Sequence, residues 1–248
     1  MLKSPLTEKG NYCKIILRKG TEHIRVQIFP GRTKTMPTLT TYKVKSKGKN
    51  LYLRVSKGHF ATGRSHMNYF IDVTIQKSRL SEASALAKEI AAYYNKNTIV
   101  DTILCLDEMQ VVGTCLAEEL TRGDFMNMNA HQTIYVVTPE STSGNQLLFR
   151  DSLAPMIAGK HVLILAASVN TCYTAKAAIE AVNYYGGVVS GIASIFATVD
   201  NCLEYPVHSV FNPNDLENYE LYPSHNCPMC KNGQKIDALV NSFGFSKL

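Results

Sequence analysis

One segment of the sequence has residue types and spacing suited to binding a phosphate. Val162 to Ala167 form an apolar run typical of a buried strand, Ser168 to Tyr173 form a short polar turn, and Thr174 to Tyr185 have helical spacing. Backbone N–H groups and two hydroxyls would converge at the helix N-terminus, where the helix dipole favours an anion. A plain capped turn between strand and helix has the same pattern, so this segment alone leaves both interpretations open.

A second group of residues has the spacing of metal ligands. Cys227 and Cys230 form a C-x-x-C pair beside His225, which is half of a zinc site. Because no second pair accompanies them, we interpret the two cysteines as packed thiols and expect no bound metal. His59 and His66 are interpreted with equal weight as surface or packing histidines and as ligand contacts.

The composition is that of a globular protein. The chain has 248 residues, 45% of them hydrophobic, which excludes disorder, collagen and small disulfide scaffolds. Seven cysteines without framework spacing indicate reduced thiols in a reducing compartment. No apolar run approaches the roughly 20 residues of a membrane span, and the start MLKSPLTEKG lacks the apolar core of a signal peptide. We therefore expect a soluble, cytoplasmic protein with no membrane partner.

Charge is distributed unevenly along the chain. Residues 1–64 contain 15 Lys and Arg but only Glu8 and Glu22, a net charge of +13, whereas residues 65–248 have a net charge of −7. This asymmetry suggests an anionic partner for the N-terminal part: nucleic acid, an acidic subunit or a phosphorylated metabolite. A basic β-face exposed to water would have the same charge.

The elements that position these residues change character along the chain. Alternating patterns at 12–18 and 23–29 predict a hairpin, 32–50 is a polar stretch, and 51–55 predicts a strand. Apolar residues at helical spacing predict a helix over 80–94. We expect residues 1–64 to pack as β-structure against the core of their own or of a partner subunit. Their Lys and Arg side chains would either lie near the ligand site or face water.

Strands and helices alternate in the rest of the chain. Strands are predicted at 98–106, 132–137, 161–167 and 188–196, and the helices between them are at 111–120 and 174–185. Buried strands separated by helices indicate an α/β fold with a parallel sheet covered on both faces. Ligands of such sheets bind at the carboxyl ends of the strands.

Three segments resemble motifs of a known family. Residues 162–174 are similar to the V-L-I-V-D-D-V-x-T-x-G-x-T segment that marks the phosphoribosyl diphosphate site of type I phosphoribosyltransferases. Residues 58–72 resemble the G-x-F-x-L-x-S-G-x-x-S-x-x-Y-x-D stretch of orotate phosphoribosyltransferases, and 227–233 resemble the C-P-L-C-K-x-G tail of many bacterial members. The resemblance spans about 58–235, and residues 1–50 have no counterpart.

The resemblance implies a type I phosphoribosyltransferase-like parallel sheet core flanked by helices. A basic β-rich extension would occupy 1–57, and the phosphoribosyltransferase-like domain, with a hood at 58–80 and a C-terminal tail, would occupy 58–248. Such a protein acts as a homodimer and uses Mg²⁺ to join orotate to phosphoribosyl diphosphate, giving orotidine 5′-monophosphate and pyrophosphate.

The resemblance also implies three sets of site residues. The residues that would cradle the phosphate are Thr171, Cys172, Tyr173 and Thr174. The pyrophosphate loop would be Leu106, Asp107, Glu108, Met109 and Gln110. The hood residues near the base would be Phe60, Arg64, Tyr69 and Phe70.

The sequence departs from the family where the chemistry needs charge. Ala166 and Ala167 occupy the positions of the acidic pair that holds the ribose hydroxyls, and methyl groups cannot accept those hydrogen bonds. Cys172 replaces a glycine, and its Cβ is expected to crowd the phosphate. Between Arg122 and Arg150 the chain has no Lys or Arg, so His131 is the only cation available where the family has a catalytic loop.

We therefore predict an orotate phosphoribosyltransferase-like protein with degraded catalytic residues. It would bind a nucleotide or phosphorylated small molecule in a regulatory or non-catalytic role. One alternative is an active orotate phosphoribosyltransferase, in which Mg²⁺ would separate Asp107 and Glu108 from the diphosphate. Another is a ligand-sensing regulator that binds nucleic acid through residues 1–64.

Overall fold

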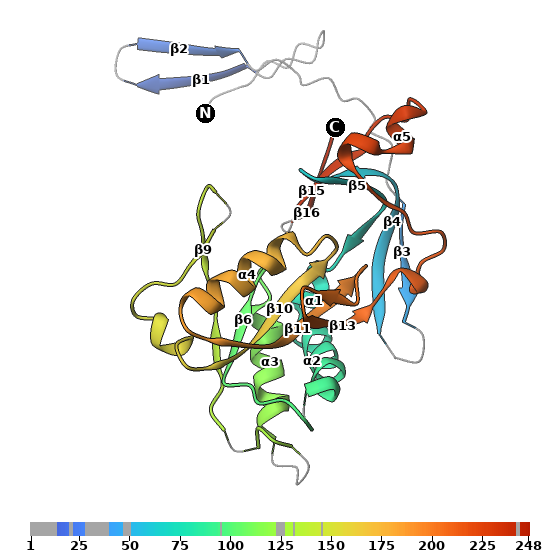
Figure 1. The fold of residues 1–248 in the computed structure, drawn as a ribbon. Helices are drawn as coiled ribbons and strands as arrows, with labels where there is room; N and C mark the ends of the chain where they lie inside the picture. Colours follow the sequence, from blue (N-terminus) through green and yellow to red (C-terminus); the bar gives the residue numbers. More distant parts are fainter. Residues whose placement is uncertain are drawn as a thin grey trace. The chain divides into compact units, whose positions relative to one another are not determined.

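The computed structural model describes residues 14–19, 22–27, 40–46, 51–94, 96–122, 127–130, 132–144, 146–241 and 244–248. The chain divides into two units, Met1–Thr38 and Leu39–Leu248. In the first unit, β1 (Lys14–Lys19) and β2 (Glu22–Gln27) pair antiparallel, with Leu17 opposite Ile24 (Figure 1). The predicted N-terminal hairpin is therefore confirmed.

The core of the second unit is a six-stranded sheet in the order β12-β13-β11-β10-β6-β7. Its strands are β6 (Thr102–Cys105), β7 (Tyr135–Val137), β10 (His161–Val169), β11 (Val188–Ala197), β12 (Asn201–Cys202) and β13 (Tyr205–Phe211). All neighbouring pairs are parallel except β12 with β13. The alternation of strands and helices therefore predicted the parallel sheet correctly.

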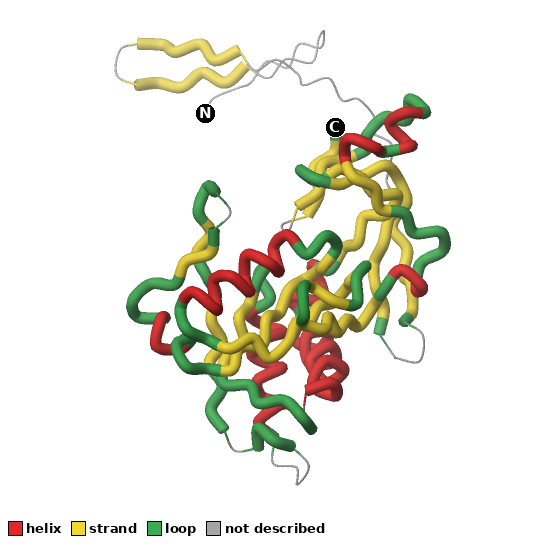
Figure 2. The backbone as a smooth tube through the Cα atoms, viewed as in Figure 1, coloured by secondary structure: helices red, strands yellow, loops and turns green. Residues whose placement is uncertain are grey.

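Helices cover both faces of this sheet. They are α1 (Thr74–Ser78), α2 (Leu80–Tyr94), α3 (Gln110–Thr121) and α4 (Tyr173–Tyr184). Along β10, Leu163 and Leu165 belong to the core shared with α2 and α3, whereas Val162 and Ile164 belong to the core shared with α4. This alternation buries every side chain in the middle of the strand, which explains the continuous apolar run. Figure 2 shows the helices around the sheet.

A second sheet forms the hood. Its strands are β3 (Thr41–Lys45), β4 (Tyr52–Ala61), β5 (Ser65–Asp72), β14 (Leu221–Pro223), β15 (Ala238–Asn241) and β16 (Gly244–Lys247). The order is β14-β5-β4-β15-β16, and β3 also pairs with β4. The hood is thus built from two segments far apart in the sequence, and the predicted fold class with a β-rich hood is confirmed.

The start of the hood differs from the expectation. The predicted boundary between 57 and 58 falls inside β4, and the predicted polar stretch 32–50 contains β3. The reason is side-chain alternation: Leu53 and Val55 are fully buried in the core, and Tyr42 and Val44 of β3 pack against it while the lysines point outward. The unit that contains the hood begins at Leu39.

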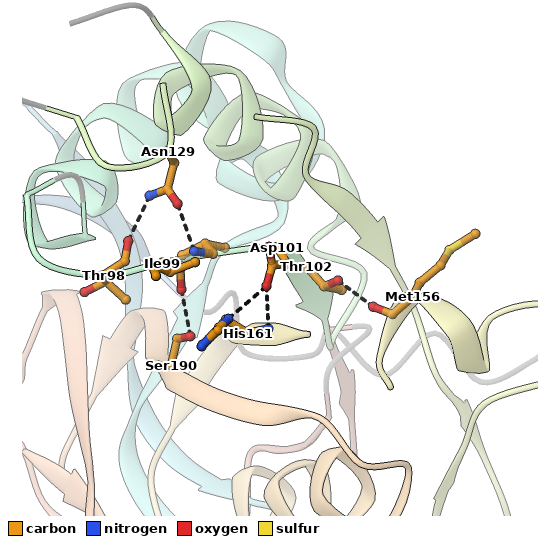
Figure 3. A network of polar contacts seen from close by, with 9 residues as sticks. Thr98, Ile99, Asp101, Thr102, Asn129, Met156, His161 and Ser190 are labelled. Carbon is orange, nitrogen blue, oxygen red and sulfur yellow. Dashed lines mark hydrogen bonds and ion pairs between the residues drawn. The ribbon is translucent and has the colours of Figure 1, made fainter. Parts of the chain in front are cut away.

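Polar side chains fix the amino end of the parallel sheet. Asn129 donates to the Thr98 carbonyl and accepts from the Val100 N–H, both at 2.9 Å (Figure 3). Asp101 accepts hydrogen bonds from His161 N at 2.8 Å and from its Nδ1 at 2.9 Å. Because Asn129 binds the backbone of residues 98–100, the strand begins at Thr102 and is shorter than the predicted 98–106.

The remaining elements are short. They are α5 (Pro228–Lys231), the pair β8 (Glu140–Ser141) and β9 (Leu147–Leu148), and 3-10 turns at Ala154–Met156, Pro213–Asp215 and Ser224–Asn226. In the part of the chain that the structure describes, no helix is long and apolar enough to cross a membrane.

Candidate functional site

A cavity of about 480 Å³ lies where the hood meets the carboxyl end of β10. The turn between β4 and β5, which includes Arg64, forms one wall, and the segment from Ala166 to Ala175 forms another. Asp107 and Phe70 complete the lining that the sequence had singled out. A ligand at the carboxyl ends of the strands is the usual arrangement in a parallel sheet.

The predicted phosphate turn lines this cavity. All four of its residues do so, and they are Thr171, Cys172, Tyr173 and Thr174. Since α4 begins at Tyr173, its first N–H groups have no partner within the helix and lie at its positive end. Arg64 lies across the turn, with its guanidinium carbon 3.4 Å from the centre of the Tyr173 ring. The site therefore combines free backbone donors, two hydroxyls and one cation.

Cys172, which occupies the position of a glycine in the motif that 162–174 resembles, has a left-handed backbone. Its φ is +57°, in the left-handed region that glycine adopts most readily. Its side chain does not crowd the turn as expected, because it packs in the core, with Sγ 3.6 Å from the Asn201 carbonyl oxygen. Burial and the neighbouring Cys172 thiol raise the pKa of Cys202 to about 12, so the Cys202 thiol stays protonated at neutral pH.

The predicted pyrophosphate loop is only partly exposed to the cavity. Asp107 lines it, whereas Leu106 and Met109 are buried in the core and Gln110 is the first residue of α3. Apolar residues at these positions hold the loop against the sheet. The loop therefore presents a single carboxylate, not a row of donors.

Lys77, which the sequence did not single out, compensates the charge of this loop. Its side chain is 7% exposed, and Nζ lies 3.0 Å from the Asp107 carbonyl oxygen and 3.3 Å from Glu108 Oε2. Asp107 Oδ2 accepts from the Ala167 N–H at 3.2 Å. Burial raises the pKa of Asp107 in spite of this bond and the nearby Lys77. The Asp107 carboxylate thus lies beside β10, next to Ala166 and Ala167, which replace the acidic pair of the resembled motif.

These residues do not form a good Mg²⁺ site. Glu108 is paired with the Lys77 ammonium, and Asp107 already accepts a backbone hydrogen bond. A cation beside the loop would repel a metal ion, and Mg²⁺ requires nearly ideal octahedral oxygen ligation. The Lys77 ammonium supplies the positive charge at this loop.

The hood residues are divided between two environments. Arg64 and Phe70 line the cavity. Phe60 is fully buried in a small core under the hood, and Tyr69 is buried against the main core, where its hydroxyl donates to the Glu217 carbonyl at 2.8 Å. Neighbouring residues of a strand face opposite sides, which separates Tyr69 from Phe70. The two buried rings cannot contact a ligand in the cavity.

Two polar atoms of the cavity walls lack partners. In the described residues, four buried side-chain atoms have no hydrogen-bond partner, and two of them, Asn170 Oδ1 and the Tyr219 hydroxyl, belong to residues that line the cavity. A buried polar group without a partner costs about 1–3 kcal/mol. These atoms are therefore candidates for hydrogen bonds to a ligand.

The predicted pair of packed thiols has more polar surroundings than expected. Cys227 and Cys230 lie against His59 and His66, and the four potential ligand atoms are within 4.8 Å of one another. His225 is not a member of this group. His131, the cation expected in the segment without Lys or Arg, lies outside the described residues.

Comparisons with known proteins were made in three ways. No protein-family model and no curated protein matches the chain. Among solved structures, it is similar to orotate phosphoribosyltransferase of Mycobacterium tuberculosis, at 17% identity over 60% of this chain and 83% of that one, with a TM-score of 0.42. It is also similar to adenine phosphoribosyltransferase of Thermoanaerobacter pseudethanolicus, at 19% identity over 58% and 88%, with a TM-score of 0.42. Adenine phosphoribosyltransferase of Trypanosoma brucei has 11% identity over 61% and 73%, with a TM-score of 0.44.

Proposed function

We propose that this protein binds a nucleotide or another phosphorylated small molecule between the hood and the core, in a regulatory and non-catalytic role. The observation that carries the proposal is the composition of the cavity. It has backbone N–H groups and two hydroxyls at the start of α4 with Arg64 opposite them, but its β10 wall has alanines where the resembled motif has acids.

The phosphate would lie at the N-terminus of α4. The first-turn N–H groups would donate to its oxygens, and the hydroxyls of Thr171 and Thr174 would add two donors. Arg64 is held over the Tyr173 ring, so its charge is positioned before a ligand arrives. This arrangement favours a monophosphate group.

The rest of the ligand would contact the deeper polar groups. The Asp107 carboxylate can accept from a hydroxyl, which is the role that Ala166 and Ala167 cannot fill. Asn170 and Tyr219 offer an acceptor and a hydroxyl without partners in the described part of the chain. A ribose and a base supply matching hydroxyl and amide groups, so a nucleoside monophosphate fits this set.

Transferase chemistry lacks its electrostatic support. Removing one donor that stabilises developing charge commonly lowers a rate by about 10²–10³. Here the acidic pair is absent, and no Lys or Arg occurs between Arg122 and Arg150. The buried Lys77 is engaged with the loop itself. Several such losses together favour a non-catalytic role.

Calorimetric titration tests the proposal. The titrants are orotate, nucleoside monophosphates, phosphoribosyl diphosphate and pyrophosphate, each with and without Mg²⁺. A monophosphate should bind without Mg²⁺, and Thr174→Val should weaken it about tenfold, as expected for one lost hydrogen bond to a charged group. Thr114→Val, at an exposed position of α3, is the matched control and should change nothing.

An enzyme assay distinguishes the first alternative. Orotate consumption with phosphoribosyl diphosphate and Mg²⁺ should remain at background, and Ala166→Asp with Ala167→Asp should not restore it. Turnover of about 1–10³ s⁻¹ would instead identify an active orotate phosphoribosyltransferase and contradict the proposal.

The charge of residues 1–64 favours a second candidate function, binding of nucleic acid. A net charge of +13 in this segment would attract phosphates, and β1 and β2 offer a hairpin on which to display it. Affinity for RNA that falls steeply with salt would support this function, and affinity without salt dependence would contradict it.

We also propose that the protein is a homodimer, as the family resemblance implies. Light scattering of the full chain measures its mass in solution and tests this proposal.

A further inference from the structure

Four side chains with metal-binding atoms meet at the tip of the hood. His59 comes from β4, His66 from β5, and Cys227 and Cys230 flank and enter α5. Three of them are buried, and Cys230 is exposed. The two histidines are thus brought to the C-x-x-C pair from a part of the sequence more than 150 residues away.

A bulge in β4 helps to place His59. The register with β5 pairs Lys57 with Tyr69 and next Phe60 with Met67, so β4 has one residue more than its partner in this interval. A bulge redirects a side chain without ending the strand. His59 is fully buried, and its ring lies 5.1 Å from that of His66.

The distances match a tetrahedral zinc site. With Zn–S of about 2.3 Å and Zn–N of about 2.0–2.1 Å, tetrahedral ligand atoms are separated by about 3.3 Å for two nitrogens and about 3.6 Å for nitrogen and sulfur. His59 Nε2 lies 3.0 Å from His66 Nδ1, 3.5 Å from Cys227 Sγ and 3.6 Å from Cys230 Sγ. Cys230 Sγ lies 3.2 Å from His66 Nδ1.

Hydrogen bonds alone explain this arrangement poorly. His59 Nε2 has three close polar neighbours, yet a ring nitrogen carries at most one proton or one lone pair. It can therefore make one good hydrogen bond among the three contacts. A cation at the centre would satisfy all four atoms at once.

The surroundings are those of a supported metal ligand. His59 Nδ1 lies 3.1 Å from the Gln234 carbonyl oxygen, so it is placed to donate there and leave the Nε2 lone pair free for the metal. Asp237 Oδ2 accepts from the His59 backbone N–H at 2.7 Å. A Cβ at Gly58 would lie only 2.8 Å from the same oxygen, so glycine permits this close approach.

We propose that His59, His66, Cys227 and Cys230 bind one Zn²⁺ ion as a closed structural site. A tetrahedral set of two sulfurs and two nitrogens is typical of zinc, and all four positions are filled by the protein. The ion would fasten the C-terminal segment to the turn between β4 and β5. That turn and β15 both line the ligand cavity, so the metal would maintain one wall of it.

Metal analysis of the purified full chain tests this site. Elemental analysis by mass spectrometry should find about one zinc ion per chain. Cys227→Ser and His66→Gln should reduce the zinc content to near background, whereas His225→Gln, beside the cluster but outside it, should retain it. The ligand variants also need a folding check by circular dichroism, because loss of a structural metal can unfold its surroundings.

A measurement on the unmodified chain does not depend on those variants. After removal of zinc by a chelator, added Co²⁺ should give the visible absorption bands of tetrahedral cobalt and a thiolate charge-transfer band. Added Zn²⁺ should then abolish both. A folded chain without zinc that gives no tetrahedral cobalt spectrum would overturn the proposal, as would a native disulfide between Cys227 and Cys230. None of these readouts depends on nucleotide binding.

Discussion

The polar side chains at the two ends of the parallel sheet differ in their hydrogen-bond partners. At the amino end, side chains such as Asn129, Asp101 and Ser190 bind the backbone of neighbouring strands (Figure 3). At the carboxyl end, Asn170 Oδ1 and the Tyr219 hydroxyl are buried without partners in the described residues. The same sheet is therefore closed by its own side chains at one end and has unused hydrogen-bonding capacity at the other.

With the proposed ligand in the cavity, this difference separates residues that stabilise the fold from residues that bind the ligand. An internal hydrogen bond contributes about 0.5–1.5 kcal/mol to stability, and a buried group without a partner costs more than this. Substitutions at the amino end should therefore change stability and leave binding intact. Substitutions at the carboxyl end should weaken ligand binding without lowering stability.

The largest effect is expected from Asn129→Ala. Asn129 is 1% exposed, and its amide serves the Thr98 carbonyl and the Val100 N–H. Truncation leaves both groups without their partner, which should cost about 2–4 kcal/mol of unfolding free energy. Urea denaturation measures the loss. Asn183→Ala, at an exposed position of α4, is the matched control and should stay within about 0.5 kcal/mol. A large fall in nucleotide affinity of the folded Asn129→Ala protein would contradict the expectation that the amino end affects stability and not binding.

Asp107→Asn should weaken nucleotide binding by about 10–100-fold, the usual worth of a hydrogen bond to a charged group. The same substitution should increase the stability of the folded protein. Because burial raises the folded pKa of Asp107, its ionised form is disfavoured at neutral pH. The variant should therefore have a higher melting temperature at pH 7. The gain should shrink as the pH falls through the raised folded pKa and should be absent below the ordinary Asp pKa of 3.8.

Calorimetry and thermal melts measure the two effects of Asp107→Asn. Asparagine tolerates the left-handed backbone at this position, where φ is +50°. Glu108→Gln removes the neighbouring carboxylate, which pairs with Lys77 and does not line the cavity. It should leave affinity nearly unchanged. Tighter nucleotide binding by Asp107→Asn would show that the carboxylate repels the ligand, against our proposal.

The sequence predicted what depends on local patterns. The apolar run of β10, the polar turn and the helical spacing of α4 fall where expected, because each is determined by burial within a short segment. The turn at 171–174 lies at the start of α4 for the same local reason, and its phosphate-binding role stays a prediction. β3 was not predicted, because its lysines made the segment look like part of the polar stretch 32–50.

Other features depend on contacts between distant segments. Lys77 reaches Asp107 and Glu108 only because α1 packs beside the loop. No residue spacing in the sequence predicts this contact. The cluster of His59, His66 and the two tail cysteines requires the tail to return to β4, where β15 pairs with it. Two histidines in one predicted hood and a C-x-x-C pair in the tail were the available signals, and only the tertiary fold joins them.

A smaller effect is expected from charge reversal of Arg64. Its guanidinium stacks on Tyr173 and lines the cavity, so Arg64→Glu should lower nucleotide affinity by more than about 1 kcal/mol, roughly fivefold. Lys57→Glu is the matched control, since Lys57 lies 3.6 Å from Glu217 and does not line this cavity. Equal losses in the two variants, measured by calorimetry, would indicate a general field effect and not a contact.

The smallest effect is the contribution of Asp101 to the pH dependence of stability. Burial raises the pKa of Asp101, but hydrogen bonds from the His161 backbone N–H and from its ring outweigh burial and hold the pKa below its ordinary value of 3.8. A lowered folded pKa means that the contribution is fully present above the unfolded pKa and is lost as the pH falls through the folded one. Asp101→Asn should therefore be less stable than the natural chain at pH 7, and the difference should shrink below about pH 3.8. Urea denaturation over a pH series measures this difference. A constant difference across the series would mean that Asp101 acts by shape and not by charge. Because the residue belongs to the amino end, nucleotide affinity at pH 7 should be the same in both proteins.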